Sequence, residues 1–165
     1  MSKSEDALKA AFAGESQANR KYLAFATEAD REGFPQVARL FRAAAEAETV
    51  HAISHFKAMK GVKSTRDNLQ EAVGGETYEF TSMYPGMIET AKAEGNKDAE
   101  ISFWRANEVE KVHAALYQGL LDTLGKSQQH YSYYVCPVCG YTCGKDVPDL
   151  CPVCATKGKL FKKID

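Results

Sequence analysis

The segment AEAETVHA (residues 45–52) combines strong helix-forming residues with two polar side chains in unexpected places. Ala and Glu have high helix propensity, and the apolar residues upstream recur every three or four positions. Continuing this spacing places Glu48 and then His51 on the side of the helix that should face the core. Such residues need a partner there, because burying an unpaired charge is strongly unfavourable.

Composition excludes several classes of partner. The chain has 165 residues, and its 21 Lys and Arg nearly balance 22 Asp and Glu, for a formal net charge of -1. This balance gives no electrostatic reason to expect nucleic acid or an anionic membrane as partner. No apolar run approaches the roughly 18 residues of a membrane span, and the first residues lack the apolar core of a signal peptide. We therefore expect a cytoplasmic protein.

Amino-acid usage changes near residue 130. Residues 1–125 contain no cysteine and are rich in Ala, Glu, Lys and Leu, whereas all five cysteines lie between residues 136 and 154. We expect a helical domain over residues 1–130 and a small turn-rich domain over residues 131–165.

The spacing of apolar residues predicts helices in the first domain. They are expected over about residues 4–32, 35–60, 65–94 and 96–125. Ser64 or Thr65 is a suitable N-cap for the third. Gly74, Gly75 and Pro85 predict a kink or a break within that helix.

Acidic residues interrupt the apolar face near the middle of every predicted helix. The acidic residues are Glu15 in the first helix, Glu48 in the second, Glu76 and Glu79 in the third, and Glu110 in the fourth. His51 and His113 follow Glu48 and Glu110 by three residues and lie on the same faces.

The sequence also repeats itself. AETVHA at 47–52 matches VEKVHA at 109–114, and GES at 14–16 resembles GET at 75–77. Two copies of one helical hairpin, related by a pseudo-twofold axis, would bring the acidic residues together.

A metal is the simplest partner for this many acidic residues. A single Glu on an apolar face usually reaches solvent, but five inward carboxylates would cost more than the roughly 5–15 kcal/mol of stability of a typical domain. Carboxylates with imidazole suit iron or manganese. One Glu from each of two helices and Glu-x-x-His from each of two others is the arrangement of ferritin-like di-iron proteins. We therefore expect a mainly α protein built as a ferritin-like four-helix bundle.

The cysteine segment predicts a second metal site. Four cysteines form the pattern C-x2-C-x11-C-x2-C, namely Cys136, Cys139, Cys151 and Cys154. This spacing suits a tetrahedral thiolate site, and on spacing alone a zinc ribbon is at least as good an interpretation as iron. Cys143 has no paired cysteine and is expected to be a free thiol.

Several motifs resemble a known family. The segments GESQANRKY (14–22), EAETVHA (46–52), GETYEFTSMYP (75–85) and EVEKVHA (108–114) are similar to rubrerythrin, and CPVCG…CPVC (136–140, 151–154) is similar to its rubredoxin-like domain. The resemblance covers nearly the whole chain, and it favours iron over zinc in the four-cysteine site.

The resemblance implies a role for each acidic residue. The implied di-iron ligands are Glu15, Glu48, Glu76, Glu110 and His113, with Glu48 and Glu110 bridging the two irons. In the family, the residues matching Glu79 and His51 alternate as ligands of one iron. Tyr22 and Tyr84 match tyrosines that hydrogen-bond the ligand carboxylates.

The resemblance also implies an activity: a non-haem di-iron peroxidase that reduces hydrogen peroxide to water. Electrons would arrive through a tetrathiolate iron from an external NAD(P)H-dependent reductase, because the sequence has no glycine-rich dinucleotide-binding motif. A homodimer is implied, and whether helices are exchanged between subunits stays open. Two alternatives remain: a ferroxidase or iron-storage protein, and a non-catalytic protein with zinc in the four-cysteine site.

Overall fold

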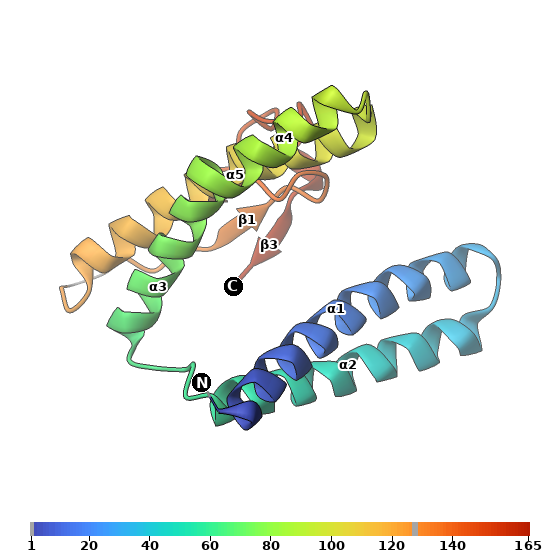
Figure 1. Cartoon of the computed structure of the whole chain (residues 1–165). Helices are drawn as coiled ribbons and strands as arrows, with labels where there is room; N and C mark the ends of the chain where they lie inside the picture. The colour runs from blue at the N-terminus through green and yellow to red at the C-terminus, as the bar shows by residue number, and fades with distance from the viewer. Residues whose placement is uncertain (1, 127–128) are drawn as a thin grey trace. The chain divides into compact units, whose positions relative to one another are not determined.

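The chain divides into two compact units, Met1–Lys63 and Ser64–Asp165, and each is described by itself. The structure is a computed structural model that describes residues 2–126 and 129–165. Figure 1 shows the helices and strands that make up the two units. None of the helices within these described ranges has the length and apolar character needed to cross a membrane.

The first unit is a hairpin of two long helices, α1 (Lys3–Arg31) and α2 (Pro35–Ala58) (Figure 1). Ser2 caps α1 in a capping box with Glu5, which satisfies two backbone N–H groups at the start of the helix. Gly33 adopts a φ of 83° in the turn, a conformation that glycine adopts without strain.

Small residues let the two helices of the first unit approach closely. The buried alanines are Ala26, Ala29, Ala38, Ala45 and Ala52. Buried Asn19 donates from Nδ2 to the Ala45 carbonyl (2.7 Å) and to Thr49 Oγ1 (2.9 Å), so its polar group is satisfied across the hairpin.

The helical part of the second unit is a second hairpin, with an interruption in its first arm. This arm contains α3 (Thr65–Tyr78), the π-helical turn η1 (Glu79–Met83) and α4 (Tyr84–Ala93), and α5 (Lys97–Thr123) forms the other arm. Ser64 accepts a hydrogen bond from the Asp67 backbone N–H, which confirms the predicted N-cap.

Pro85 explains the π turn. Proline has no backbone N–H, and its ring clashes with the carbonyl four residues earlier, here that of Thr81. The helix widens instead, and the Tyr84 N–H bonds to the carbonyl of Glu79, five residues back. The expected irregularity of this helix therefore falls at residues 79–83, while Gly74 and Gly75 remain within α3.

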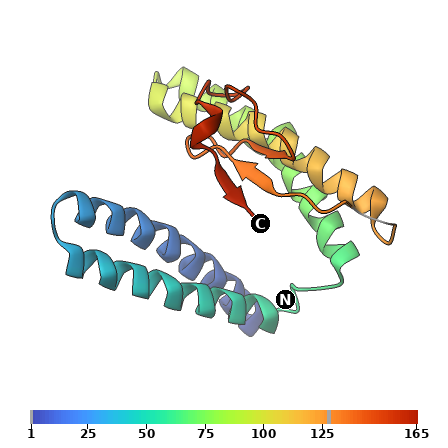
Figure 2. The same cartoon turned by 180° about the vertical axis from the view of Figure 1, so that it is seen from behind.

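The end of the chain forms a small sheet beside α5. Its strands are β1 (Tyr133–Val135), β2 (Thr142–Gly144) and β3 (Lys162–Ile164), with the 3-10 turn η2 (Gly158–Leu160) before the last. The order is β2-β1-β3, with both pairs antiparallel, and Tyr134 lies opposite Cys143 and Lys163. Strand β2 contacts α5, and the view from behind shows the sheet against that helix (Figure 2).

The predicted fold class is confirmed: the chain is mainly helical, with a small C-terminal sheet and a cluster of four cysteines in the turns beside it. The helix ends agree with the predicted ranges to within about two residues, apart from the π turn. The division of the chain into compact units falls between residues 63 and 64 and does not test the expected domain boundary near residue 130, which stays a prediction.

Candidate metal centres

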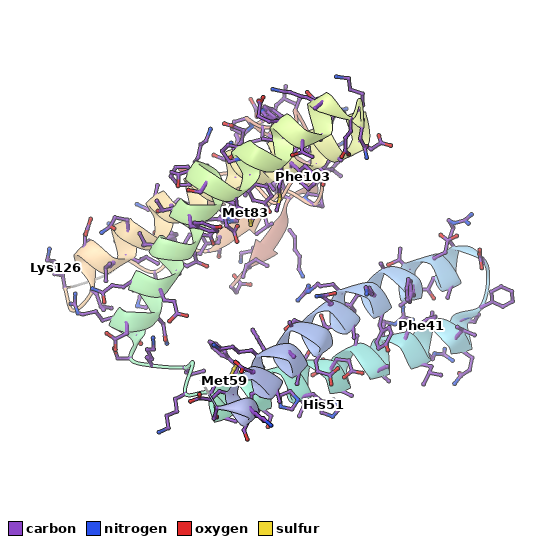
Figure 3. All side chains as sticks on the ribbon, viewed as in Figure 1. Phe41, His51, Met59, Met83, Phe103 and Lys126 are labelled. Carbon is purple, nitrogen blue, oxygen red and sulfur yellow. The ribbon has the colours of Figure 1, made fainter. Side chains whose placement is uncertain are left out.

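The first candidate site lies within the α1–α2 hairpin. Ligand atoms of Glu15 on α1 and of Glu48 and His51 on α2 all lie within 4.8 Å of one another. The Glu-x-x-His spacing places both α2 side chains on one face of the helix, with His51 Nδ1 2.9 Å from Glu48 Oε2. Figure 3 marks His51 on α2.

One residue of this group, His51, is less buried than its position on the apolar face of the helix predicts. The Glu48 side chain is 18 % exposed, but the His51 side chain is 56 % exposed. The imidazole is therefore exposed within this unit, and the expectation that it faces the core of a four-helix bundle stays a prediction. The physical reason is that a two-helix hairpin covers only one face of each helix.

The second candidate site repeats the first within the other hairpin. Ligand atoms of Glu76 on α3 and of Glu110 and His113 on α5 lie within 4.8 Å of one another. His113 Nδ1 is 2.8 Å from Glu110 Oε2 and 3.8 Å from Glu76 Oε2. The sequence repeat therefore builds the same three-residue group in each hairpin.

The second group has the electrostatics of a cation site. Burial, followed by a hydrogen bond with Glu110 and the negative charge of that residue, raises the pKa of Glu76 to about 7. Burial also raises the pKa of Glu110. In both groups the converging atoms are carboxylate oxygens and an imidazole nitrogen, so a bound cation would offset their mutual repulsion.

Glu79 lies beside this second group, as the first residue of the π turn. Burial and the negative charge of Glu76 raise its pKa, while His113 opposes the shift. Glu79 is close enough to feel these charges but is not among the three residues whose ligand atoms converge.

The two predicted tyrosines occupy different surroundings. Tyr22 packs against Phe25 and Phe41, with ring centroids 6.3 and 6.1 Å away; Phe41 is labelled in Figure 3. Tyr84 packs against Phe103, with centroids 6.4 Å apart. Burial, then the negative charges of the nearby carboxylates, raises the pKa of Tyr84, so its hydroxyl keeps its proton and can donate a hydrogen bond.

The four predicted thiolate ligands converge in the C-terminal module. Their sulfur atoms lie within 4.8 Å of one another, and the contacts Cys136–Cys154 and Cys139–Cys151 measure 3.6 and 3.5 Å. All four are free thiols, and Cys136 and Cys151 are buried. Four sulfurs at such distances suit a tetrahedral metal site.

Two matching turns hold these cysteines. In one, the Gly140 N–H donates to the Cys136 carbonyl (3.0 Å), and in the other the Ala155 N–H donates to the Cys151 carbonyl (2.9 Å). Gly140 and Ala155 both have positive φ, 83° and 58°. Cys143 lies outside the group, on β2, with its Sγ 3.9 Å from the Tyr134 carbonyl.

One polar residue near the second group was missed from the sequence. Thr142 on β2 lies 3.0 Å, Oγ1 to Nε2, from His113 on α5. Since 29 residues separate them, no local spacing could have marked the pair.

Together these sites define a class of protein: a helical carboxylate–histidine di-iron protein with an added four-cysteine module. The family model for rubrerythrin matches residues 6–121, and the model for the rubrerythrin rubredoxin-like domain matches residues 134–162. The chain therefore belongs to the rubrerythrin family.

Individual relatives agree with this assignment. Rubrerythrin-2 of Clostridium acetobutylicum is 36% identical over 173 residues, which cover 95% of this chain and 94% of that protein. Nigerythrin of Nitratidesulfovibrio vulgaris is 36% identical over 161 residues, covering 89% and 79%. A solved structure of nigerythrin in its fully reduced, all-ferrous state matches with a TM-score of 0.61 and 32% identity, covering 99% of this chain and 88% of that one.

Proposed function

We propose that this protein is a non-haem di-iron peroxidase that reduces hydrogen peroxide to water, with electrons delivered through a tetrathiolate iron. The observation that carries the proposal is the presence in one chain of two Glu/Glu-x-x-His groups and a four-cysteine module. Iron storage or iron oxidation uses the first kind of site but has no evident need for the second. Membership of the rubrerythrin family supports the same choice.

The proposed ligands follow the two repeated groups. Glu15, Glu48, Glu76, Glu110 and His113 would hold the two irons, with Glu48 and Glu110 proposed as the shared ligands and Glu79 and His51 proposed as the alternating ligands. When bound, the two irons store the two electrons that cleavage of the peroxide O–O bond requires.

Two tyrosines of the chain are proposed to donate hydrogen bonds to the carboxylates of the iron centre. Tyr84 keeps its proton at neutral pH and can donate a hydrogen bond toward the carboxylates whose charges act on it. Tyr22 is proposed to do the same for the first group. We propose domains at residues 1–130 and 131–165, the first for peroxide chemistry and the second for electron transfer.

The remaining partners are proposals of the same kind. A separate NAD(P)H-dependent reductase would supply electrons, because the chain has no dinucleotide-binding motif of its own. The protein is proposed to act as a cytoplasmic homodimer, without nucleic acid or membrane partners.

Metal analysis joined to a peroxide assay tests this function. Anaerobically purified protein is expected to hold three irons per chain, to show a thiolate-to-iron absorption band, and to consume peroxide when an NADH-linked reductase is added. Iron oxidation by oxygen that is faster than peroxide reduction would favour a ferroxidase. Zinc without iron would favour the non-catalytic alternative.

Replacing Glu79 with alanine is expected to slow peroxide reduction by about tenfold while iron stays bound. The extra carboxylate would stabilise the more highly charged oxidised centre, so its loss should also make that centre easier to reduce. Stopped-flow oxidation of the reduced protein by peroxide and a redox titration measure the two effects.

Glu89→Ala is the matched control for this change, because Glu89 lies on α4 with a side chain that is 78 % exposed and makes a surface ion pair with Lys92. It should leave both measurements unchanged. A Glu79→Ala protein with wild-type rate and potential would make Glu79 a spectator and favour the ferroxidase.

A further inference from the structure

A hydrogen bond joins the second carboxylate–histidine group to the cysteine module within one unit of the chain. His113 on α5 places Nε2 3.0 Å from Thr142 Oγ1 on β2. The Thr142 hydroxyl also donates to the Gly140 carbonyl at 3.0 Å. Gly140 directly follows Cys139, one of the four clustered thiols.

The partners of the two ring nitrogens indicate the tautomer that a metal-binding His113 would take. A threonine hydroxyl has one proton, and here it goes to the Gly140 carbonyl. When that proton goes to Gly140, Thr142 accepts from His113, and the proton of a neutral imidazole is then on Nε2. Nδ1 is then left to bind a cation among the carboxylates, 2.8 Å from Glu110 Oε2 and 3.8 Å from Glu76 Oε2. Without a cation, the 2.8 Å contact needs a proton, on Nδ1 or on the carboxyl group. The Nε2-protonated tautomer is the one that can bind a metal among those carboxylates.

The surroundings favour a strong bond. A hollow of about 200 Å³ beside the bond is lined mainly by apolar parts of side chains, from Leu116, Tyr117, Leu120 and Tyr133. Low local polarity strengthens a hydrogen bond relative to one in water. Thr142 is itself held in place, because β2 pairs with β1 and Gly140 is tied to Cys136 by a backbone hydrogen bond.

The two repeated histidines therefore differ. The His113 side chain is 27 % exposed and contacts the module through Nε2, whereas the His51 side chain is 56 % exposed. The cysteine module follows only the second hairpin in the sequence, so the repeat supplies Glu-x-x-His twice but a threonine from β2 once.

We infer that Thr142 is a positioning residue: it holds His113 in the Nε2-protonated tautomer, with Nδ1 directed to the metal, and thereby makes retention of that metal depend on the cysteine module of the same chain. The inference rests on the proposed function in one respect, that His113 binds a metal. Partners of this type typically change metal affinity by about 10–100-fold.

Metal release from the loaded, full-length protein tests the inference. Thr142→Val removes the hydroxyl and nearly preserves side-chain shape, so release to a ferrous chelator from the carboxylate–histidine centre should become at least about tenfold faster. Thr142→Ser keeps a hydroxyl and should restore slow release. The thiolate absorption band should stay unchanged in both variants.

Thr156→Val is the matched control in the other cysteine turn. Its hydroxyl lies 3.1 Å from Cys154 Sγ, so its loss should shift the thiolate absorption band and leave release from the carboxylates unchanged. Equal release rates for wild type and Thr142→Val would overturn the inference, as would a Thr142→Ser protein that releases metal as fast as Thr142→Val.

The readout is independent of peroxide turnover. If the protein binds metal at these carboxylates but reduces no peroxide, the proposed function fails, and the same release experiment on that metal still decides the role of Thr142. A wild-type protein that holds no metal at His113 overturns the inference directly.

Discussion

Replacing Glu110 with alanine is expected to remove iron from the carboxylate–histidine centre and to abolish peroxide turnover. Glu110 is the most enclosed acid of its group, with a side chain that is 15 % exposed, and its carboxylate lies 2.8 Å from His113 Nδ1. Loss of an outer partner alone costs about 10–100-fold in metal affinity or activity, and a lost bridging ligand should cost more. The iron of the cysteine module should remain.

Iron analysis, the thiolate absorption band and the peroxide assay together measure this result. Glu48→Ala makes the equivalent change in the first hairpin and should have the same outcome, whereas Glu15→Ala should lose iron only in part. Glu100→Ala is the control, because Glu100 is also a half-buried acid on α5, with a side chain that is 22 % exposed, but pairs with Lys97 and lies outside the converging group. Full iron content and full turnover in Glu110→Ala would refute the ligand assignment.

Replacing Cys136 with serine is expected to destroy the thiolate site and to stop sustained turnover, while one round of peroxide reduction survives. Cys136 is 1 % exposed, and its sulfur lies 3.6 Å from that of Cys154, so the substitution removes a thiolate ligand from an enclosed site. The helices should still form, because their caps and buried alanines lie outside the module. Chemically reduced protein should therefore still consume one peroxide per di-iron site.

Steady-state and single-turnover assays separate the two effects. Cys143→Ser is the matched control, because this thiol lies on β2 of the same module but outside the metal-binding group. It should leave the steady-state rate unchanged. Undiminished steady-state turnover in Cys136→Ser would show that the module has only a structural role. If Thr142 acts as inferred, Cys136→Ser should also release the carboxylate-held iron faster.

Local spacing was enough to predict most of the side chains that converge in the candidate metal sites. Glu48 with His51, and Glu110 with His113, are three residues apart on helices, so helix geometry alone places each pair on one face. The same holds for each C-x2-C pair, because a single turn brings both sulfurs to one side. The Ser64 cap and the helix ends likewise depend on residues only a few positions apart.

Only the tertiary structure decided the features that depend on contacts between distant segments. The π turn could not be placed from Gly74, Gly75 and Pro85 alone, because it depends on how the helix relieves the clash at Pro85. His51 and His113 lie in the same motif, yet only the tertiary structure shows that β2 packs against His113. Thr142 reaches His113 across 29 residues, and no sequence period records such a contact, because it is formed by a strand folding back on a helix.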